Sequence, residues 1–507
     1  MYRSSITGLR GMLLMLGLAA GPVLTMVDSS VVNVALAAIT RSFGASLDTT
    51  QWIASGYLLA MAVVLPATAY LASRFGSMTT YLSCMLGFTV VSALCALAPS
   101  AEVLIGLRAL QGAFGAPLTP LAIAMFLGGG NAVAVAGSPV VAGIIFFAAP
   151  ALGPTVGGLL IAGAGWPWVF WINVPLGIAG IASVLRVGLD EPRDRCASFD
   201  GVGFMLLGLG AGLAVYGANE GPQVGWLDPR SLPYWLGGGV LVAAYVAWTT
   251  RCERPLLDVR LLYRRIAALA TTVTAIASVV MYAVLILVPT FLQLAQGISP
   301  IVAGLVLLPQ ALATGLGLGI GARAAARRGM RATAAGGMLT LLAGTLILYV
   351  IRGDTPPAVI AALLCMRGFA VGFVEQPLLS GMLAGLSRAQ TAEFSTLYDV
   401  TQRIAGAAGI GVFLTFFQAR ERADIGNALQ RMGAPVSRSI ATAIGGDSGA
   451  ASLSSLPPGV HAAVATAASQ ALGETSLALL ALALVGTALA LVVPNRAGPA
   501  TPVPARG

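Results

Sequence analysis

The chain contains 507 residues, of which 57% are hydrophobic and only 9% are charged, whereas soluble domains carry roughly 25% charged residues. This composition excludes a soluble globular protein, and the long, numerous apolar runs exclude a disordered or collagen-like chain. The net charge of +9 reflects 28 basic residues, all of them arginines and most of them between apolar runs, so a nucleic-acid-binding face is excluded as well. We therefore expect an all-α polytopic membrane protein with about fourteen transmembrane helices.

Fourteen apolar runs follow one another along the sequence, and each is predicted to be a helix because an open sheet cannot satisfy its backbone in lipid. The predicted spans are 12–40, 50–72, 79–98, 102–126, 133–163, 166–188, 200–218, 232–250, 266–292, 299–322, 331–352, 357–386, 394–419 and 473–493. The positive-inside rule favours an even number of spans with both termini in the cytoplasm. The first run is too long for the apolar core of a signal peptide, so we expect an uncleaved first helix.

A weak internal repeat suggests how the chain is divided. Ala69–Gly76, after the second span, is similar to Ala322–Gly329, after the tenth, although generic helix packing can also produce such a repeat. Paired six-helix repeats with a central site are a common transporter design. The predicted domains are an N-terminal six-helix bundle (1–190), a two-helix insert with cytoplasmic flanks (191–262) and a C-terminal six-helix bundle (263–507) with an external loop (420–472). That loop is expected either to cap the outer mouth or to be a tolerated insertion.

Ionisable side chains inside the predicted spans are the candidate functional groups, because each costs about 2.5–3.5 kcal/mol at the centre of a bilayer. There are six of them: Asp28, Arg108, Arg367, Glu375, Asp399 and Arg403. Asp28 and Arg108 lie at matching depths and can pair, and Asp399 and Arg403 share one helix face at an i, i+4 spacing. The alternative is that these residues form buried ion pairs with a purely structural role.

Glu375 has no basic residue one helical turn away, which favours a proton or cation site. The single histidine, His461, lies outside every predicted span, so proton transfer within the membrane must depend on carboxylates. A carboxylate whose counter-ion changes between two conformations changes its proton affinity between them, as proton coupling requires.

Glycine and proline shape the fifth span, where Gly153, Pro154, Gly157 and Gly158 are expected to combine a kink with close helix packing. The aromatic run Trp166–Pro175 is typical of an interfacial belt and a helix start. Trp52 and Tyr57 in the second span are more typical of packing than of a binding site. No phosphate-binding loop occurs, and the chain has no lysine to complete one. Five cysteines show no metal or disulfide spacing. We therefore expect no enzyme activity, no metal and no cofactor, with an ion gradient as the energy source.

Several stretches resemble one known family. They are Leu24–Leu36 (LTMVDSSVVNVAL), Arg108–Gly112 (RALQG), Gly153–Gly158, Trp166–Pro175, Asp200–Gly203 and Pro255–Asp258. Together they are similar to motifs of the fourteen-helix drug:proton antiporters of the major facilitator superfamily, the EmrB/QacA type. The resemblance covers residues of about 12–420 and 473–493 and implies the major facilitator fold. It also implies a coupling role for Asp28 and a proton-relay role for Arg108.

Some motif positions differ from that family. Ser73 and Ala326 stand where its gating motifs carry an acid, and Ser77-Met78 replaces a basic pair. Glu393 and Asp399 resemble acids that cation-exporting members place near the start of span 13.

The sequence thus predicts a secondary active exporter that exchanges protons for amphipathic organic compounds, with cations favoured, by alternating access. The candidates for proton coupling are Asp28, Arg108, Glu375 and Asp399. Those for substrate binding are Glu375, Asp28, Tyr57, Asn33 and Gln111, and those for conformational motifs are Gly153, Pro154, Gly157, Gly158, Arg74 and Gly76.

The expected location is a bacterial cytoplasmic membrane. The expected partners are a small-molecule substrate, protons and the lipid bilayer, without nucleic acid. We expect a monomer, and an accessory periplasmic adaptor is left open. One alternative is a dedicated exporter of an endogenous metabolite or antibiotic, and the other is a membrane scaffold or sensor that does not transport.

Overall fold

The computed structural model describes residues 9–128, 156–186, 198–226, 228–253, 255–383, 388–431 and 458–494. All regular secondary structure within these ranges is helical. Ten helices in this part of the chain are long and apolar enough to cross a membrane, which agrees with the predicted polytopic all-α class. We refer to residues 9–186 as the first half and to residues 265–494 as the second half. Helix ends are named cytoplasmic or outer according to the predicted topology.

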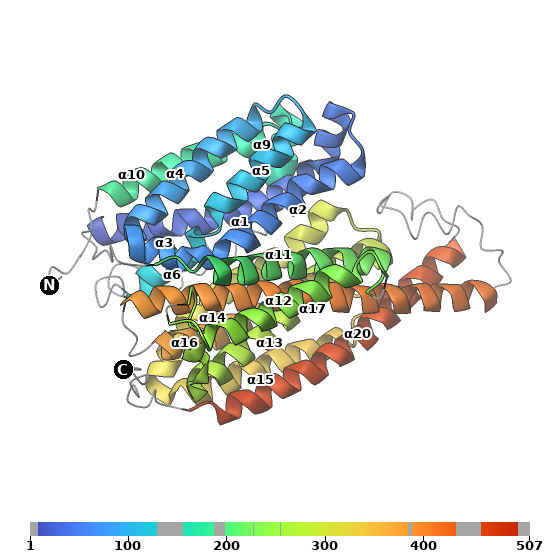
Figure 1. Ribbon diagram of the computed structural model, residues 1–507. Coiled ribbons are helices and arrows are strands. Elements are labelled where there is room, and N and C mark those ends of the chain that lie inside the picture. Colours follow the sequence, from blue (N-terminus) through green and yellow to red (C-terminus); the bar gives the residue numbers. More distant parts are fainter. Residues whose placement is uncertain are drawn as a thin grey trace.

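The first half contains a bundle whose longer members lie side by side in Figure 1. Its elements are α1 (Leu9–Phe43), α2 (Leu47–Val64), η1 (Leu65–Ala67), α3 (Thr68–Phe75), α4 (Ser77–Ala96), α5 (Ala101–Gly115), α6 (Leu118–Gly128), a helix over 156–164, α9 (Trp168–Trp171) and α10 (Asn173–Leu185). The second predicted span changes to a 3-10 turn at Pro66, and the fourth is interrupted next to Pro117. Both breaks occur where proline removes a backbone donor.

Proline also interrupts α1, upstream of Asp28. Pro22 has no N–H, so the carbonyl of Leu18 lacks its usual helical donor. The hydroxyl of Tyr81 on α4 lies 2.9 Å from this carbonyl and 2.9 Å from the carbonyl of Gly17, and it accepts the Gly21 N–H at 3.0 Å. A buried tyrosine thus supplies a donor to the carbonyl that the proline leaves without one.

The insert consists of two helices that pack against each other, α11 (Gly201–Val224) and α12 (Leu232–Thr249). α11 also contacts α2 of the first half and α17 of the second half. Trp52 stacks on Tyr216 of α11 with ring centroids 5.7 Å apart. Beyond the end of α11, Trp226 donates a 2.8 Å hydrogen bond to Thr415 of α17. The insert is therefore attached to both halves.

The short helix η2 (Val259–Tyr263) precedes the second half. The second half contains α13 (Arg265–Gln296), α14 (Pro300–Arg328), α15 (Met330–Leu348), α16 (Pro357–Leu383), α17 (Arg388–Arg431) and α20 (Pro458–Val492). In Figure 1, α17 and α20 extend together beyond the other helices. The external loop 420–472 is therefore helical at both of its ends, and the segment near 415–432 continues span 13 as a polar helix, as its sequence predicts.

The weak repeat has the same backbone geometry in both copies. Gly76 has φ 92° and Gly329 has φ 86°, a region that favours glycine because it has no Cβ. Each glycine ends one helix and begins the next. Ser73 of the first copy donates a 2.9 Å hydrogen bond to the carbonyl of Tyr70 in its own helix.

The two halves meet through α17. This helix contacts α3, η1 and α6, which lie toward the cytoplasmic ends of the first half. Val400 of α17 belongs to the same buried cluster as Leu65 and Leu121. Within the described residues, these contacts bring the cytoplasmic ends of the two halves together.

Candidate functional site

The carboxylate of Asp28 lies at the centre of a buried polar network in the first half. Arg108 of α5 donates to its Oδ2 at 2.5 Å. Gln111, one turn further along α5, donates to Oδ1 at 3.2 Å, and Asn173 of α10 donates to the same oxygen at 2.8 Å. All four side chains are at most 1% exposed. The ionised carboxylate therefore has the donors that a buried charge requires.

The guanidinium of Arg108 is held on several sides. Its Nε donates to the carbonyl of Ile53 at 3.2 Å, and its NH1 also donates to Gln111 at 2.7 Å. The ring of Tyr57 lies 4.1 Å from the guanidinium carbon, and the ring of Phe170 lies 5.7 Å from it. These distances suit cation–π attraction.

The predicted contact between Asp28 and Arg108 is confirmed, and two further candidates, Gln111 and Tyr57, belong to the same network. Asn173 and its partner Ser92, which accepts from Asn173 at 3.0 Å, were not among the predicted residues. The only available signal was an amide side chain within the apolar run 166–188, where the surrounding tryptophans indicated an interfacial belt instead.

A second polar cluster surrounds Glu375 on α16. Its carboxyl group hydrogen-bonds to Gln402 of α17, which also contacts Ser278 of α13. Tyr398, one turn before Gln402, hydrogen-bonds to the same amide. Among the described residues, no arginine forms an ion pair with Glu375. The structure therefore places this acid among neutral polar and aromatic groups. A proton or cation that binds there does not encounter a positive side chain that already pairs with Glu375.

The predicted pair of Asp399 and Arg403 is also confirmed, at 2.9 Å within α17. It is less buried than the first pair, with side chains 13% and 32% exposed. Arg403 also reaches Met61 of α2, whose sulfur lies 3.0 Å from NH1. Met61 lies one turn beyond Tyr57, so this arginine connects the second half to the helix that covers Arg108.

The remaining candidates lie apart from these clusters. Asn33 is exposed on α1, and Arg74 lies beside Gly76 at the end of α3. Gly157 packs against α1, because an added Cβ would lie 3.1 Å from a methyl group of Val31, as expected for close helix packing. Gly158 lies in the same helix. Gly153 and Pro154 lie outside the described residues.

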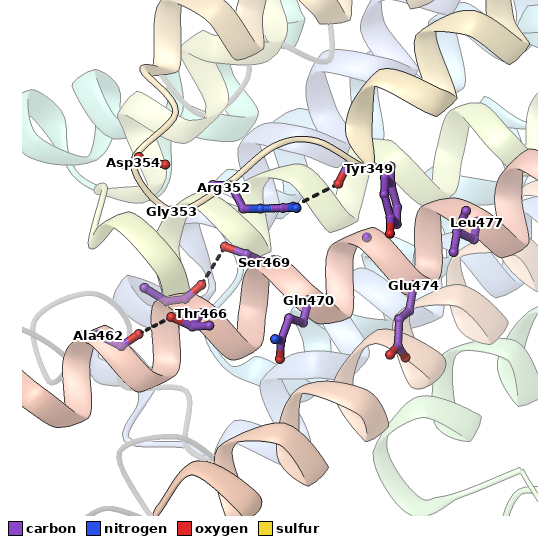
Figure 2. A pocket seen from close by; sticks show the side chains of 12 residues that line it. Tyr349, Arg352, Gly353, Asp354, Ala462, Thr466, Ser469, Gln470, Glu474 and Leu477 are labelled. Atoms are coloured by element: carbon purple, nitrogen blue, oxygen red, sulfur yellow. Dashed lines mark hydrogen bonds between the residues drawn. The ribbon is translucent and has the colours of Figure 1, made fainter.

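A separate cavity of about 910 Å³ opens at the outer end of the second half. Figure 2 shows its two walls, the turn after α15 and the outer part of α20. Arg352 turns back to donate to the carbonyl of Tyr349 at 3.0 Å, and Gln470 and Glu474 line the α20 wall. The cavity contains none of the predicted coupling or substrate-binding residues.

Within the described residues, no three His, Cys, Asp or Glu side chains gather closely enough to hold a metal ion. The arrangement offers proton-accepting carboxylates, permanent cations and aromatic faces. Such groups suit reversible binding of protons and organic cations.

Comparison with known proteins gives concordant matches. The profile of the Major Facilitator Superfamily matches residues 18–410. The chain is 32% identical over 410 residues to the "Multidrug resistance protein B homolog" of Mycobacterium tuberculosis (strain H37Rv), covering 78% of this chain and 74% of that protein. It is 34% identical over 301 residues to the "Tetracenomycin C resistance and export protein" of Streptomyces glaucescens, covering 58% and 55%. The fold is similar to that of the human organic anion transporter MFSD10 (TETRAN), with a TM-score of 0.54, 15% identity and coverage of 95% and 97%.

Proposed function

We propose that this chain, which belongs to the Major Facilitator Superfamily, is a secondary active exporter that exchanges protons for amphipathic organic compounds. Family membership and the all-helical structure confirm the predicted fold class. The names of the similar proteins support drug export as the transported direction and substrate class. The observation that carries proton coupling is the ion pair of Asp28 and Arg108, which is 0% and 1% exposed.

In the proposed cycle, Asp28 is the coupling acid. Protonation of Asp28 removes the negative charge that Arg108 neutralises. The Asp28–Arg108 pair is therefore strong when Asp28 is ionised and weak when Asp28 is protonated. A ligand shifts a conformational equilibrium only through such a difference between states. Arg108 keeps its charge throughout, because guanidinium is effectively always protonated in proteins.

The substrate is proposed to bind between the halves, with its cationic group near Glu375. The charge of Glu375 acts on the hydroxyl groups of both Tyr398 and Tyr282, so these two rings lie near this acid. An aromatic face and a carboxylate together attract an organic cation more strongly than either group alone. Asp399 and Arg403 lie on the adjacent helix and are proposed to sense the approach of the two halves.

The proposed location is a bacterial cytoplasmic membrane, with both termini in the cytoplasm. The exporter is proposed to act without enzymatic chemistry and as a monomer. Its energy source is the proton gradient, so no bound cofactor is needed.

An efflux assay tests this function directly. Ethidium accumulation is measured in a bacterial host that lacks its own efflux pumps, with and without the protein, before and after a protonophore. We expect lower accumulation that the protonophore abolishes. Unchanged accumulation with well-expressed protein would refute export of organic cations.

The role of Asp28 is tested in proteoliposomes with Asp28→Asn and Glu375→Gln. Asp28→Asn should lose transport driven by a pH gradient but keep exchange of labelled substrate at equal pH. The matched control is Asp228→Asn, since Asp228 lies in an exposed turn where the side-chain hydrogen bond from Arg230 lowers its pKa. Full gradient-driven transport by both Asp28→Asn and Glu375→Gln would show that the assignment of roles is wrong.

A dedicated exporter of one antibiotic or metabolite is the second candidate. The similarity to a protein named for tetracenomycin C resistance and export favours it. A panel of unrelated organic cations, tested in the same host, separates the two. Export of several cations supports a broad exporter, whereas export of a single compound class supports the dedicated one.

A further inference from the structure

One nitrogen of Arg108 bridges two oxygen atoms in the buried network of the first half. Arg108 NH1 donates to Asp28 Oδ2 at 2.5 Å and to Gln111 Oε1 at 2.7 Å. Gln111 Nε2 donates in turn to Asp28 Oδ1 at 3.2 Å. The carboxylate of Asp28 and the amide of Gln111 thus already share one hydrogen bond, and the arginine joins their two remaining oxygens.

Two contacts fix the orientation of the Gln111 amide. The oxygen and the nitrogen of a side-chain amide are assigned from their hydrogen bonds. Arginine has donors only, so the amide has to turn its oxygen toward Arg108. The thiol of Cys95 lies 3.6 Å from the same oxygen and is a second donor to it. The NH₂ group of Gln111 is therefore the part that meets Asp28 Oδ1.

Protonation changes what Asp28 requires from its neighbours. An ionised carboxylate only accepts hydrogen bonds, whereas a protonated one also has an O–H group to donate. Asp28 is 0% exposed, and a buried donor without an acceptor is unfavourable. The side chains that donate to Asp28 are one guanidinium and two amides. Of these three, only the amides of Gln111 and Asn173 contain an acceptor atom.

Asn173 is the less suitable of the two acceptors. Its Nδ2 donates to Asp28 Oδ1 at 2.8 Å and to Ser92 Oγ at 3.0 Å, and its Oδ1 takes part in no hydrogen bond. Turning this amide toward the acid would give up both donated hydrogen bonds. Gln111 does not have to turn, because its Oε1 and Asp28 Oδ2 already share one donor.

We propose that Gln111 is a positioning residue for proton coupling and accepts the hydrogen bond of protonated Asp28. A proton from the gradient adds to Oδ2, and its O–H replaces the N–H that Arg108 donates to this oxygen. The new O–H donates to Gln111 Oε1, while Gln111 Nε2 keeps its hydrogen bond to Oδ1. Acid and amide then form a closed ring of two hydrogen bonds. This inference rests on the proposed coupling role of Asp28.

Closing this ring leaves Arg108 NH1 without its two acceptors. Arg108 Nε keeps the carbonyl of Ile53, and the ring of Tyr57 remains beside the guanidinium, but Asp28 no longer balances the charge. A buried cation without a counter-ion is expensive, so protonation favours a conformation in which α5 carries Arg108 to another partner. Asn173 holds Oδ1 in both protonation states.

Infrared difference spectroscopy of the purified full chain tests this arrangement, because hydrogen bonding lowers the C=O stretching frequency of a carboxylic acid. Spectra at acidic and neutral pH are compared, and the Asp28 band is the one that Asp28→Asn removes. Gln111→Met and Asn173→Leu each remove one donor to Oδ1, but only Gln111→Met also removes the proposed acceptor. We expect both to shift the band to higher wavenumber, with the larger shift in Gln111→Met. Equal shifts, or a larger one in Asn173→Leu, would overturn the role of Gln111.

A labelling experiment on the wild-type chain gives the same answer if Gln111→Met does not fold. Glutamine is labelled with the heavy carbon isotope at its side-chain carbonyl. The labelled band should change on acidification, because Gln111 Oε1 exchanges an arginine N–H for a carboxyl O–H, and part of this change should be missing in Asp28→Asn. Identical changes in both chains would refute the proposal.

The same spectra separate this inference from the proposed function. If an Asp28 band forms but the two variants shift it equally, the role of Gln111 fails and the coupling role of Asp28 stands. If no band depends on Asp28 at any pH at which the chain stays folded, both fail together.

Discussion

Tyr81→Phe is expected to destabilise the first half, because one hydroxyl satisfies the backbone of α1 around Pro22. The variant keeps the aromatic ring and removes the hydroxyl from the carbonyl of Leu18 and the N–H of Gly21. Tyr81 is 0% exposed, so water cannot easily take the place of the hydroxyl. The carbonyl of Leu18 is then left without a donor.

A buried polar group without a partner costs about 1–3 kcal/mol, and we expect Tyr81→Phe to lower the free energy of unfolding by that amount. Pro22→Ala restores an N–H that can reach the carbonyl of Leu18. In the Tyr81→Phe background it should therefore recover about 1 kcal/mol more than it does in the wild type. The difference between the two backgrounds is the coupling between the proline and the hydroxyl.

The measurement is unfolding by sodium dodecyl sulfate in mixed micelles, followed by tryptophan fluorescence. Tyr263→Phe is the control, since Tyr263 is 72% exposed and a surface change of this kind stays within about 0.5 kcal/mol. If Tyr81→Phe is as stable as the wild type, or if Pro22→Ala has the same effect in both backgrounds, the hydroxyl does not serve the interrupted helix and the reasoning fails.

Two other substitutions test helix packing. Gly112→Ala should reduce stability by about 1–3 kcal/mol, because its Cβ would lie 2.2 Å from the Tyr57 carbonyl oxygen and push α2 away from Arg108. Gly106→Ala on the same helix meets nothing within 4 Å and should be neutral or slightly stabilising, and thermal unfolding compares the two. Trp226→Phe removes the hydrogen bond to Thr415 and should cost about 0.5–1.5 kcal/mol. Combining it with Thr415→Val in the same micelle titration should cost little more if that bond is the cause.

Helix positions are predictable from this sequence because the bilayer requires long apolar segments with internally satisfied backbones. The end of a helix and the end of a membrane span are separate predictions, as α17 shows by continuing past the span limit at 419 to Arg431. Hydropathy falls there because Arg420, Glu421 and Arg422 enter the sequence, but arginine and glutamate are good helix formers. Polarity thus marks where a helix leaves the apolar layer, whereas the helix itself ends elsewhere.

The candidate site is predictable only where depth in the membrane determines contact. Asp28 and Arg108 could be matched by counting residues from the helix ends, since a buried charge requires a partner. The contact of Asn173 with Asp28 could not be predicted by counting residues, because it depends on how α10 rotates after the short helix α9. Gln402 beside Glu375 is a similar case, since the two residues lie on neighbouring helices whose relative rotation the sequence does not specify.

The two confirmed ion pairs differ in what can separate them. Asp28, Arg108 and their partners Gln111, Ile53 and Asn173 all lie on helices of the first half, so rocking the halves as rigid bodies leaves every one of these contacts intact. Arg403, in contrast, reaches across to Met61, and rocking changes that contact directly. If Asp28 is the coupling acid, as proposed, its protonation requires helices to move within the first half. In this structure the second half contacts α2 through Arg403, and this contact can drive such a movement.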